Sequence, residues 1–150
     1  MPAPRASEPA ASEPPTHTYE YAIVRVVPRV ERGEFLNVGA IVYCKARGFL
    51  EARIALDRAR LAALFPFCEA DALVPHLEAI ARVCRGGAEA GALGALSQVE
   101  RFHWLVAPRS TIIQPSPVHA GRCADPAATL EELIARMVRL PVTDEREPAP

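Results

Sequence analysis

The chain has 150 residues, half of them hydrophobic, and carries 17 basic and 18 acidic side chains for a formal net charge of −1. This length supports one domain with one core, and the near-neutral charge argues against a general nucleic-acid binder, which needs a strongly basic face. No stretch has the apolar length of a membrane span and no secretory signal follows Met1, so we expect a cytoplasmic protein with no membrane partner.

Composition divides the chain into a domain and two tails. Residues 1–18 consist mainly of Pro, Ala, Ser and Glu, and residues 141–150 have a similar composition. Such segments have too little apolar surface to bury, so we expect both tails to be disordered. The predicted domain therefore spans residues 19–140.

Three strands are predicted in the first part of the domain. Tyr19–Val27 is rich in aromatic and β-branched residues and ends at Pro28, and Val38–Cys44 is almost entirely apolar. Phe49–Leu56 alternates apolar and charged residues, which is typical of a strand with one solvated face. Because Gly48 allows a tight turn between the second and third strands, we expect an antiparallel meander.

Two helices are predicted to follow, then two strands and a last helix. Asp57 is a favourable N-cap for a short helix, and a second helix spans about Asp71–Cys84. Arg101–Ala107 is predicted as a fourth strand and Thr111–Gln114 as a fifth. Pro126 begins the last helix. The predicted buried stripe of this helix contains Leu130, Leu133, Ile134 and Met137. The predicted fold is α+β, an antiparallel sheet of four or five strands with three helices packed on one face.

Two segments are more polar than their structural positions require. Arg29–Asn37 connects two apolar strands, and Arg101–His119 includes a turn at Arg109. Loops held by a rigid sheet often carry binding residues. An anion site at Arg109 and a merely solvated turn are equally good interpretations of the second segment. The candidate ligand- or partner-binding residues are Arg109, Ser110, Gln114, Ser116, Arg32, Glu34 and Asn37.

Arg25 lies inside an apolar strand. A buried guanidinium group needs a carboxylate or several carbonyl groups, so we expect a structural ion pair, with Glu34 or Glu100 as its partner. Ligand binding by Arg25 is the alternative.

His103 and His119 are weak candidates for acid–base catalysis, because histidine titrates near neutral pH. Neither belongs to a paired-histidine motif, and packed histidines are the simpler interpretation. No metal or cofactor motif is present. The cysteines are widely spaced, which favours reduced core residues over a zinc or redox site. They are Cys44, Cys68, Cys84 and Cys123.

Three strings resemble a known family: YAIVRVVP from Tyr21, ERGEFLNVG from Glu31 and FHWLVAPRSTIIQPSPVH from Phe102. They are similar to the bacterial family catalogued as domain of unknown function 3037, over essentially Tyr19–Leu140. The resemblance implies no assigned activity. Members are often encoded beside a HipA-like serine kinase, which suggests a partner or accessory role.

Two functional hypotheses follow from these observations. The first is a non-catalytic binding or regulatory module that engages a protein partner, with a HipA-like kinase as the candidate. The alternative is a small hydrolase or transferase acting on phosphate-bearing substrates with His103, His119 and Arg109. An enzyme of this kind requires these three side chains to converge in one cleft.

Overall fold

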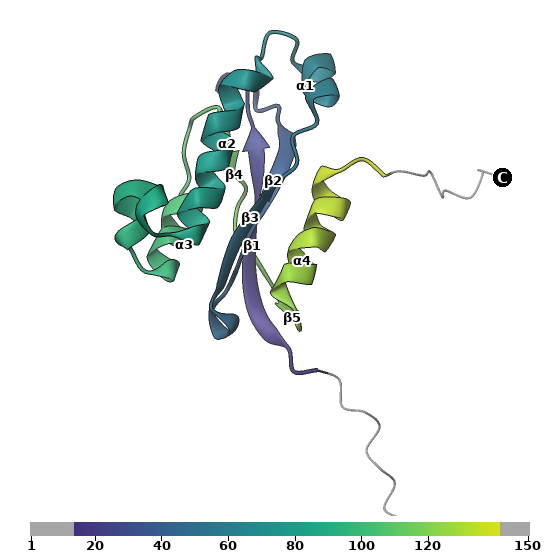
Figure 1. Cartoon of the computed structure of the whole chain (residues 1–150). Coiled ribbons are helices and arrows are strands. Elements are labelled where there is room, and N and C mark those ends of the chain that lie inside the picture. The colour runs from purple at the N-terminus through teal and green to yellow at the C-terminus, as the bar shows by residue number, and fades with distance from the viewer. Residues whose placement is uncertain (1–13, 142–150) are drawn as a thin grey trace, which may run out of the picture.

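The first strand organises the sheet in the computed structural model, which describes residues 14–141 (Figure 1). β1 (His17–Val26) pairs with β2 along one side and with β4 and β5 along the other, all antiparallel. β1 begins two residues before the expected domain boundary. The expectation of disorder for residues 1–13 and 142–150 lies outside the described residues.

The predicted α+β class and antiparallel sheet are confirmed. The sheet has five strands in the order β3-β2-β1-β4, and β5 also pairs with β1. The remaining strands are β2 (Leu36–Cys44), β3 (Phe49–Ile54), β4 (Ile113–Pro115) and β5 (His119–Cys123). The α-helices are α1 (Arg58–Leu64), α2 (Ala70–Arg85), α3 (Gln98–Val106) and α4 (Pro126–Leu133).

The helices cover both faces of the sheet, whereas the sequence analysis placed all of them on one. α1, α2 and α3 pack on the face that includes Val24, and α4 packs on the opposite face against Ile23 (Figure 1). The physical reason lies in the central strands, where successive side chains point to opposite faces and both sets are apolar. A second helical layer is therefore needed to bury Ile23, Ala40 and Val42.

The predicted strand Arg101–Ala107 is wrong, because this segment belongs to helix α3. Ser97 is the N-cap, and a capping box joins it to Glu100 through both side chains. The helix buries Phe102 and Leu105, three positions apart on one face. The aromatic and β-branched composition of the segment favoured a strand locally, but packing on the sheet favours a helix.

Helix α4 continues into a π-helical turn, Ile134–Val138. The predicted stripe residues Leu130, Leu133 and Ile134 are buried, but Met137 is exposed and Val138 takes its place in the core. A π turn accommodates one more residue than an α turn, which shifts the buried position by one. The regular helical period used in the sequence analysis therefore placed Met137 wrongly.

A β-bulge lies at Gly39 in strand β2. Val24 pairs with Gly39 and Arg25 pairs with Asn37, which leaves Val38 without a partner in β1. A Cβ atom on Gly39 would lie only 2.6 Å from the Arg53 carbonyl oxygen. The glycine therefore permits close approach of β3.

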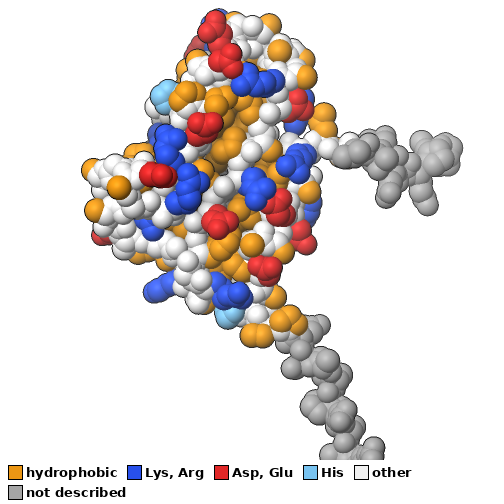
Figure 2. All heavy atoms as spheres, in the orientation of Figure 1, with side chains coloured by type: hydrophobic (Ala, Val, Ile, Leu, Met, Phe, Trp, Pro, Cys, Tyr) orange, Lys and Arg blue, Asp and Glu red, His pale blue; other side chains and the backbone are white. Residues whose placement is uncertain are grey.

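Strand β3 forms one edge of the sheet, and its exposed side chains include Glu51 and Arg53. Figure 2 shows acidic and basic side chains interspersed across one face, with hydrophobic side chains between them. This face lacks the extended basic area that a general nucleic-acid binder uses. None of the helices described between residues 14 and 141 has the length and apolar character needed to cross a membrane.

Candidate binding surfaces

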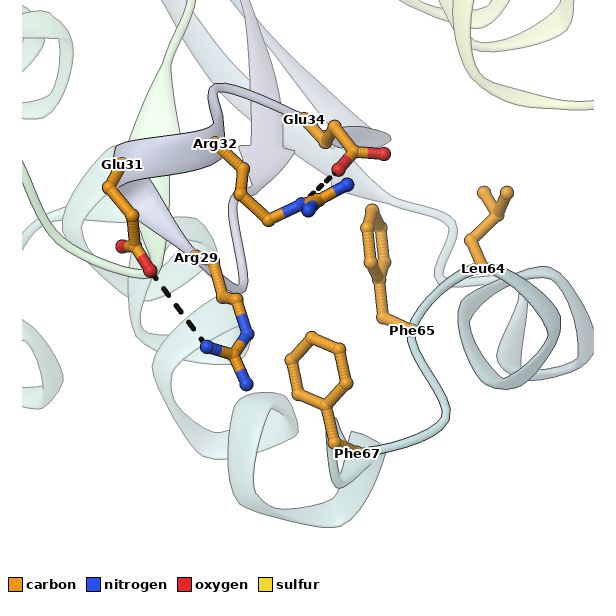
Figure 3. A pocket seen from close by; sticks show the side chains of 7 residues that line it. All are labelled: Arg29, Glu31, Arg32, Glu34, Leu64, Phe65 and Phe67. Carbon is orange, nitrogen blue, oxygen red and sulfur yellow. Dashed lines mark hydrogen bonds and ion pairs between the residues drawn. The ribbon is translucent and has the colours of Figure 1, made fainter.

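The loop after β1 forms one wall of a pocket at the end of the sheet (Figure 3). A 3₁₀ turn, Val30–Arg32, follows Arg29, and Gly33 closes it in the left-handed conformation with φ of 70°. Because a 3₁₀ turn has three residues, Arg29 and Arg32 emerge on the same side. Figure 3 shows both guanidinium groups directed into the pocket.

The loop between α1 and α2 supplies the opposite wall, with Leu64, Phe65 and Phe67. Phe65 is buried and anchors the loop, and its ring meets the Phe67 ring edge-on at a centroid separation of 6.4 Å. The Arg29 guanidinium carbon lies 5.0 Å from the centre of the Phe67 ring. We call this cavity of about 510 Å³ the arginine–phenylalanine pocket; its lining is Arg29, Glu31, Arg32, Glu34, Leu64, Phe65 and Phe67.

The structure divides the candidate residues of the first polar segment. Arg32 and Glu34 line the arginine–phenylalanine pocket and form an ion pair with each other. Asn37 instead turns toward the π-helical turn, where its side-chain amide donates a hydrogen bond to the Met137 carbonyl at 3.0 Å. Asn37 therefore holds the C-terminal helix on the sheet and does not belong to the pocket.

A second hollow, which we call the α2 groove, lies between helix α2 and the segment 107–113. Its volume is about 720 Å³. The α2 side supplies Ala72, Leu73, His76, Ala79, Ile80 and Val83, and the other side supplies Trp104, Arg109, Thr111, Ile112 and Ile113. None of these residues is acidic, and most are apolar.

Arg109 lies at the rim of the α2 groove and is held in place by helix α3. Its Nη2 atom donates to the Trp104 carbonyl at 2.6 Å, and its Nε atom donates to the Ala107 carbonyl at 3.4 Å. The guanidinium carbon also lies 4.8 Å from the centre of the Trp104 ring. Arg109 thus caps the end of α3, while its remaining N–H groups form no hydrogen bond or ion pair within residues 14–141.

The other candidate residues of the second polar segment do not line the α2 groove with Arg109. Ser110 is exposed, and Gln114 lies in β4 opposite Arg25. Ser116 is buried, accepts a hydrogen bond from the Ile23 amide at 2.8 Å and donates to the Pro117 carbonyl. Ser116 is therefore a structural residue that satisfies an amide of the central strand.

The predicted ion pair of Arg25 is not formed among the described residues. Glu34 pairs with Arg32, and Glu100 belongs to the capping box of α3. The Arg25 guanidinium carbon instead lies 4.0 Å from the centre of the Phe35 ring. Arg25 is only partly buried in β1, so a cation–π contact with the exposed Phe35 ring can replace the expected carboxylate.

The two histidines do not converge with Arg109. His103 is exposed on α3, where its ring lies near Phe102. His119 lies in β5 and packs on Tyr21, which contacts the core cluster beneath α4. Arg109 lies on the opposite face of the sheet, in the α2 groove. The sheet therefore separates His119 from Arg109, and the shared cleft that an enzyme would need is not formed by these three residues.

The cysteines show no activated thiol. Cys44, Cys84 and Cys123 are buried and all four are unpaired, while Cys68 is partly exposed. Burial in the core raises the pKa of the Cys84 thiol to about 12, and burial also raises the pKa of Cys123. No group of three or more His, Cys, Asp and Glu side chains forms a metal site in the part of the chain that the structure describes.

We expect one thiol to react with a disulfide reagent in the native protein near pH 8, namely Cys68. Burial raises the pKa of the Cys84 thiol to about 12 and shields the buried thiols from the reagent. Partial burial and the Glu69 carboxylate also raise the pKa of Cys68, but its thiol is partly exposed and can meet the reagent. Absorbance of the released chromophore measures the rate. Cys68→Ser should remove the fast phase; a fast phase that persists would contradict the burial of the other three.

The sequence analysis missed the aromatic wall of the arginine–phenylalanine pocket. Leu64 and Phe67 lie near the junction of two helices and are more than half exposed. A signal was present in Phe65-Pro-Phe67, where two large apolar rings flank a helix-ending proline. Which ring would be buried and which exposed depends on the packing of α1 and α2 on the sheet.

Residues 21–138 match a family model described as "Protein of unknown function (DUF3037)". No curated protein and no solved structure matches the chain.

Proposed function

The chain belongs to the DUF3037 family, and on that premise we propose that it is a non-catalytic binding module that engages a protein partner through the arginine–phenylalanine pocket. The observation that supports this proposal is the exposed Phe67 ring beneath the Arg29 guanidinium group. Arginine and aromatic side chains are enriched at the energetic centres of protein interfaces. A partner side chain packed against this pair would displace water from both groups.

Two large apolar side chains of this pocket are exposed. Phe67 is 56% exposed and Leu64 is 55% exposed, and both line the same pocket. Exposed apolar side chains that cluster around a hollow, with charged groups at the rim, are typical of an interaction site. The buried Phe65 ring fixes the loop that carries them, so little ordering would be required on binding.

The charged side chains at the rim of this pocket can exchange their ion-pair partners. Arg29 lies 3.9 Å from Glu31 with both side chains largely exposed, and the Arg32–Glu34 pair is exposed as well. Exposed ion pairs of this kind stabilise a protein by only about 0–1 kcal/mol, so a partner's charged groups can replace them at little cost. Both signs of charge are present, which favours orientation of the partner over simple attraction.

A HipA-like kinase is the partner that we propose, and the cytoplasm is the compartment. The choice of partner rests on the family resemblance, which implies that members are often encoded beside such a kinase. The alternative, a phosphate-directed hydrolase or transferase, gains no support from the positions of His103, His119 and Arg109. The binding hypothesis is therefore the one to test first.

Phe67→Ala is expected to weaken binding to the HipA-like kinase by about 2 kcal/mol, roughly thirtyfold in Kd. The melting temperature should stay close to that of the wild type, because the ring is already more than half exposed. Calorimetric titration of the purified kinase measures the affinity. Leu140→Ala removes an equally exposed apolar side chain outside the pocket and should leave the affinity unchanged.

The arginines offer a matched pair for the same titration. Arg29 and Arg58 have side chains that are each 57% exposed, and each is paired with one acid, but only Arg29 lines the pocket. Arg29→Ala should weaken binding and Arg58→Ala should not. Equal effects of the two variants would contradict the pocket as the site, and a wild-type protein that does not bind the kinase would contradict the partner.

A further inference from the structure

The α2 groove differs in chemistry from the arginine–phenylalanine pocket. Its floor and walls are apolar, with Leu73, Ile80 and Ile113 from the core side and Trp104 and Ile112 more exposed at the rim. At about 720 Å³ it has the size of a small-molecule site. Such sites combine a mostly apolar lining with a few well-placed polar groups.

Arg109 is the permanent charge among the residues that line the α2 groove, and no acidic residue lines it. Two of the guanidinium nitrogens, Nη2 and Nε, donate hydrogen bonds to the carbonyl groups of Trp104 and Ala107, respectively. These bonds fix the orientation of the group and leave the Nη1 atom without a hydrogen-bond partner among residues 14–141. A guanidinium group held in this way is a preorganised donor for an anion.

The contact with Trp104 supports this arrangement. The Arg109 guanidinium carbon lies 4.8 Å from the centre of the indole ring, which borders the same groove. An apolar ligand body placed against the indole would therefore bring an attached anionic group close to Arg109. No carboxylate of the described residues lies within ion-pair distance of Arg109. An anionic group of a ligand bound there would therefore neutralise the Arg109 charge.

We propose that the α2 groove binds a small amphiphilic carboxylate, with its apolar body along α2 and its carboxylate at Arg109. The groove supplies apolar surface for one part of such a ligand and a single cation for the other. The site is separate from the arginine–phenylalanine pocket, and the inference does not depend on the protein partner proposed above.

The chain provides its own probe for this site, because Trp104 is the only tryptophan and lies at the groove. Full-length protein is titrated with decanoate below its micellar concentration, and Trp104 fluorescence is recorded. Decan-1-ol serves as the matched ligand without the carboxylate. We expect a saturable shift of the emission to shorter wavelength with decanoate, and at least tenfold weaker binding of the alcohol.

Arg109→Ala should weaken decanoate binding ten- to hundredfold and leave binding of the alcohol unchanged. Arg109→Lys should restore only part of the affinity, since an ammonium group lacks the planar fork of donors. Because Arg109 also caps α3, Ile112→Asp is a second variant, which places a negative charge at the exposed rim and should repel decanoate more than the alcohol. Arg29→Ala should bind decanoate as the wild type does.

Three outcomes would overturn the proposal. The first is the absence of a saturable change with decanoate. The second is equal affinity for decanoate and decan-1-ol that is insensitive to Arg109→Ala. The third is a fluorescence shift produced by an acidic amphipathic peptide but not by decanoate, which would identify the groove as a helix-binding surface. Kinase binding that is unaffected by Arg109→Ala would show that the two sites are independent.

Discussion

Ile134→Ala is expected to lower the free energy of unfolding by about 3–4 kcal/mol. Ile134 is fully buried in the cluster beneath α4, with Ile23, Val42 and Leu130. Removing its side chain eliminates apolar contacts and leaves a cavity between the helix and the second face of the sheet. Against a typical total stability of about 5–15 kcal/mol, this is a large loss.

Urea denaturation followed by circular dichroism measures this change. Met137→Ala is the matched control, because Met137 lies in the same turn but is exposed, and it should cost less than about 1 kcal/mol. If the two variants were equally stable, the position of α4 on the second face would be contradicted. The comparison also tests the π-helical turn, since a regular helix would bury Met137.

Arg101→Met is the second variant with a large expected effect, about 3 kcal/mol of destabilisation. Arg101 is only 8% exposed, and its Nη1 atom donates hydrogen bonds to the carbonyl groups of Val83 and Cys84, both at 3.0 Å. These carbonyls belong to the last turn of α2, where no helical amide remains to bond them. Methionine preserves the apolar contacts but leaves both buried carbonyl groups without this donor.

The charge of Arg101 is placed favourably as well. It lies at the C-terminal end of α2, where the helix dipole stabilises a cation. Gly86 makes room for it, since a Cβ atom there would lie 2.3 Å from the Arg101 Nη1 atom. Arg85→Met is the control, because Arg85 ends the same helix but is exposed. A midpoint of urea unfolding for Arg101→Met equal to that of this control would contradict the capping role.

The sheet strands β1 to β3 and the helices α1, α2 and α4 could be predicted because their signals are local. Asp57 accepts a hydrogen bond from the Arg60 amide as an N-cap, and Asp125 does the same for the Ala127 amide ahead of α4. Gly48 adopts the left-handed conformation expected of the turn between β2 and β3. Caps, turns and alternation act within a few residues, so they can be read without the rest of the fold.

The incorrect predictions concern segments whose structure depends on contacts with residues distant in the sequence. A capping box joins Ser97 and Glu100 at the start of helix α3, but the sequence analysis relied on the strand-like composition that follows these residues. Arg101 was the first residue of the predicted strand, whereas its role depends on α2, more than fifteen residues earlier. Tertiary packing routinely overrides weak local propensity in this way.

The candidate sites were predicted in part for the same reason. Arg32, Glu34 and Arg109 could be selected as polar residues in loops, and they do border the two hollows. Phe67 and Trp104, which complete these hollows, could not, because an exposed aromatic ring and a core ring look alike in sequence. The separation of His119 from Arg109 required the sheet topology itself.

The outer edge of strand β3 bears on how the protein avoids self-association. Glu51 and Arg53 are exposed on this strand, and Arg53 lies 2.6 Å from Glu131 of helix α4. An exposed strand edge can add a strand from another molecule and seed aggregation, and charged side chains oppose this. A neighbouring copy would have to accommodate both charges and disturb an ion pair that joins sheet to helix. The edge is therefore protected against edge-to-edge polymerisation, and binding by strand addition is disfavoured there.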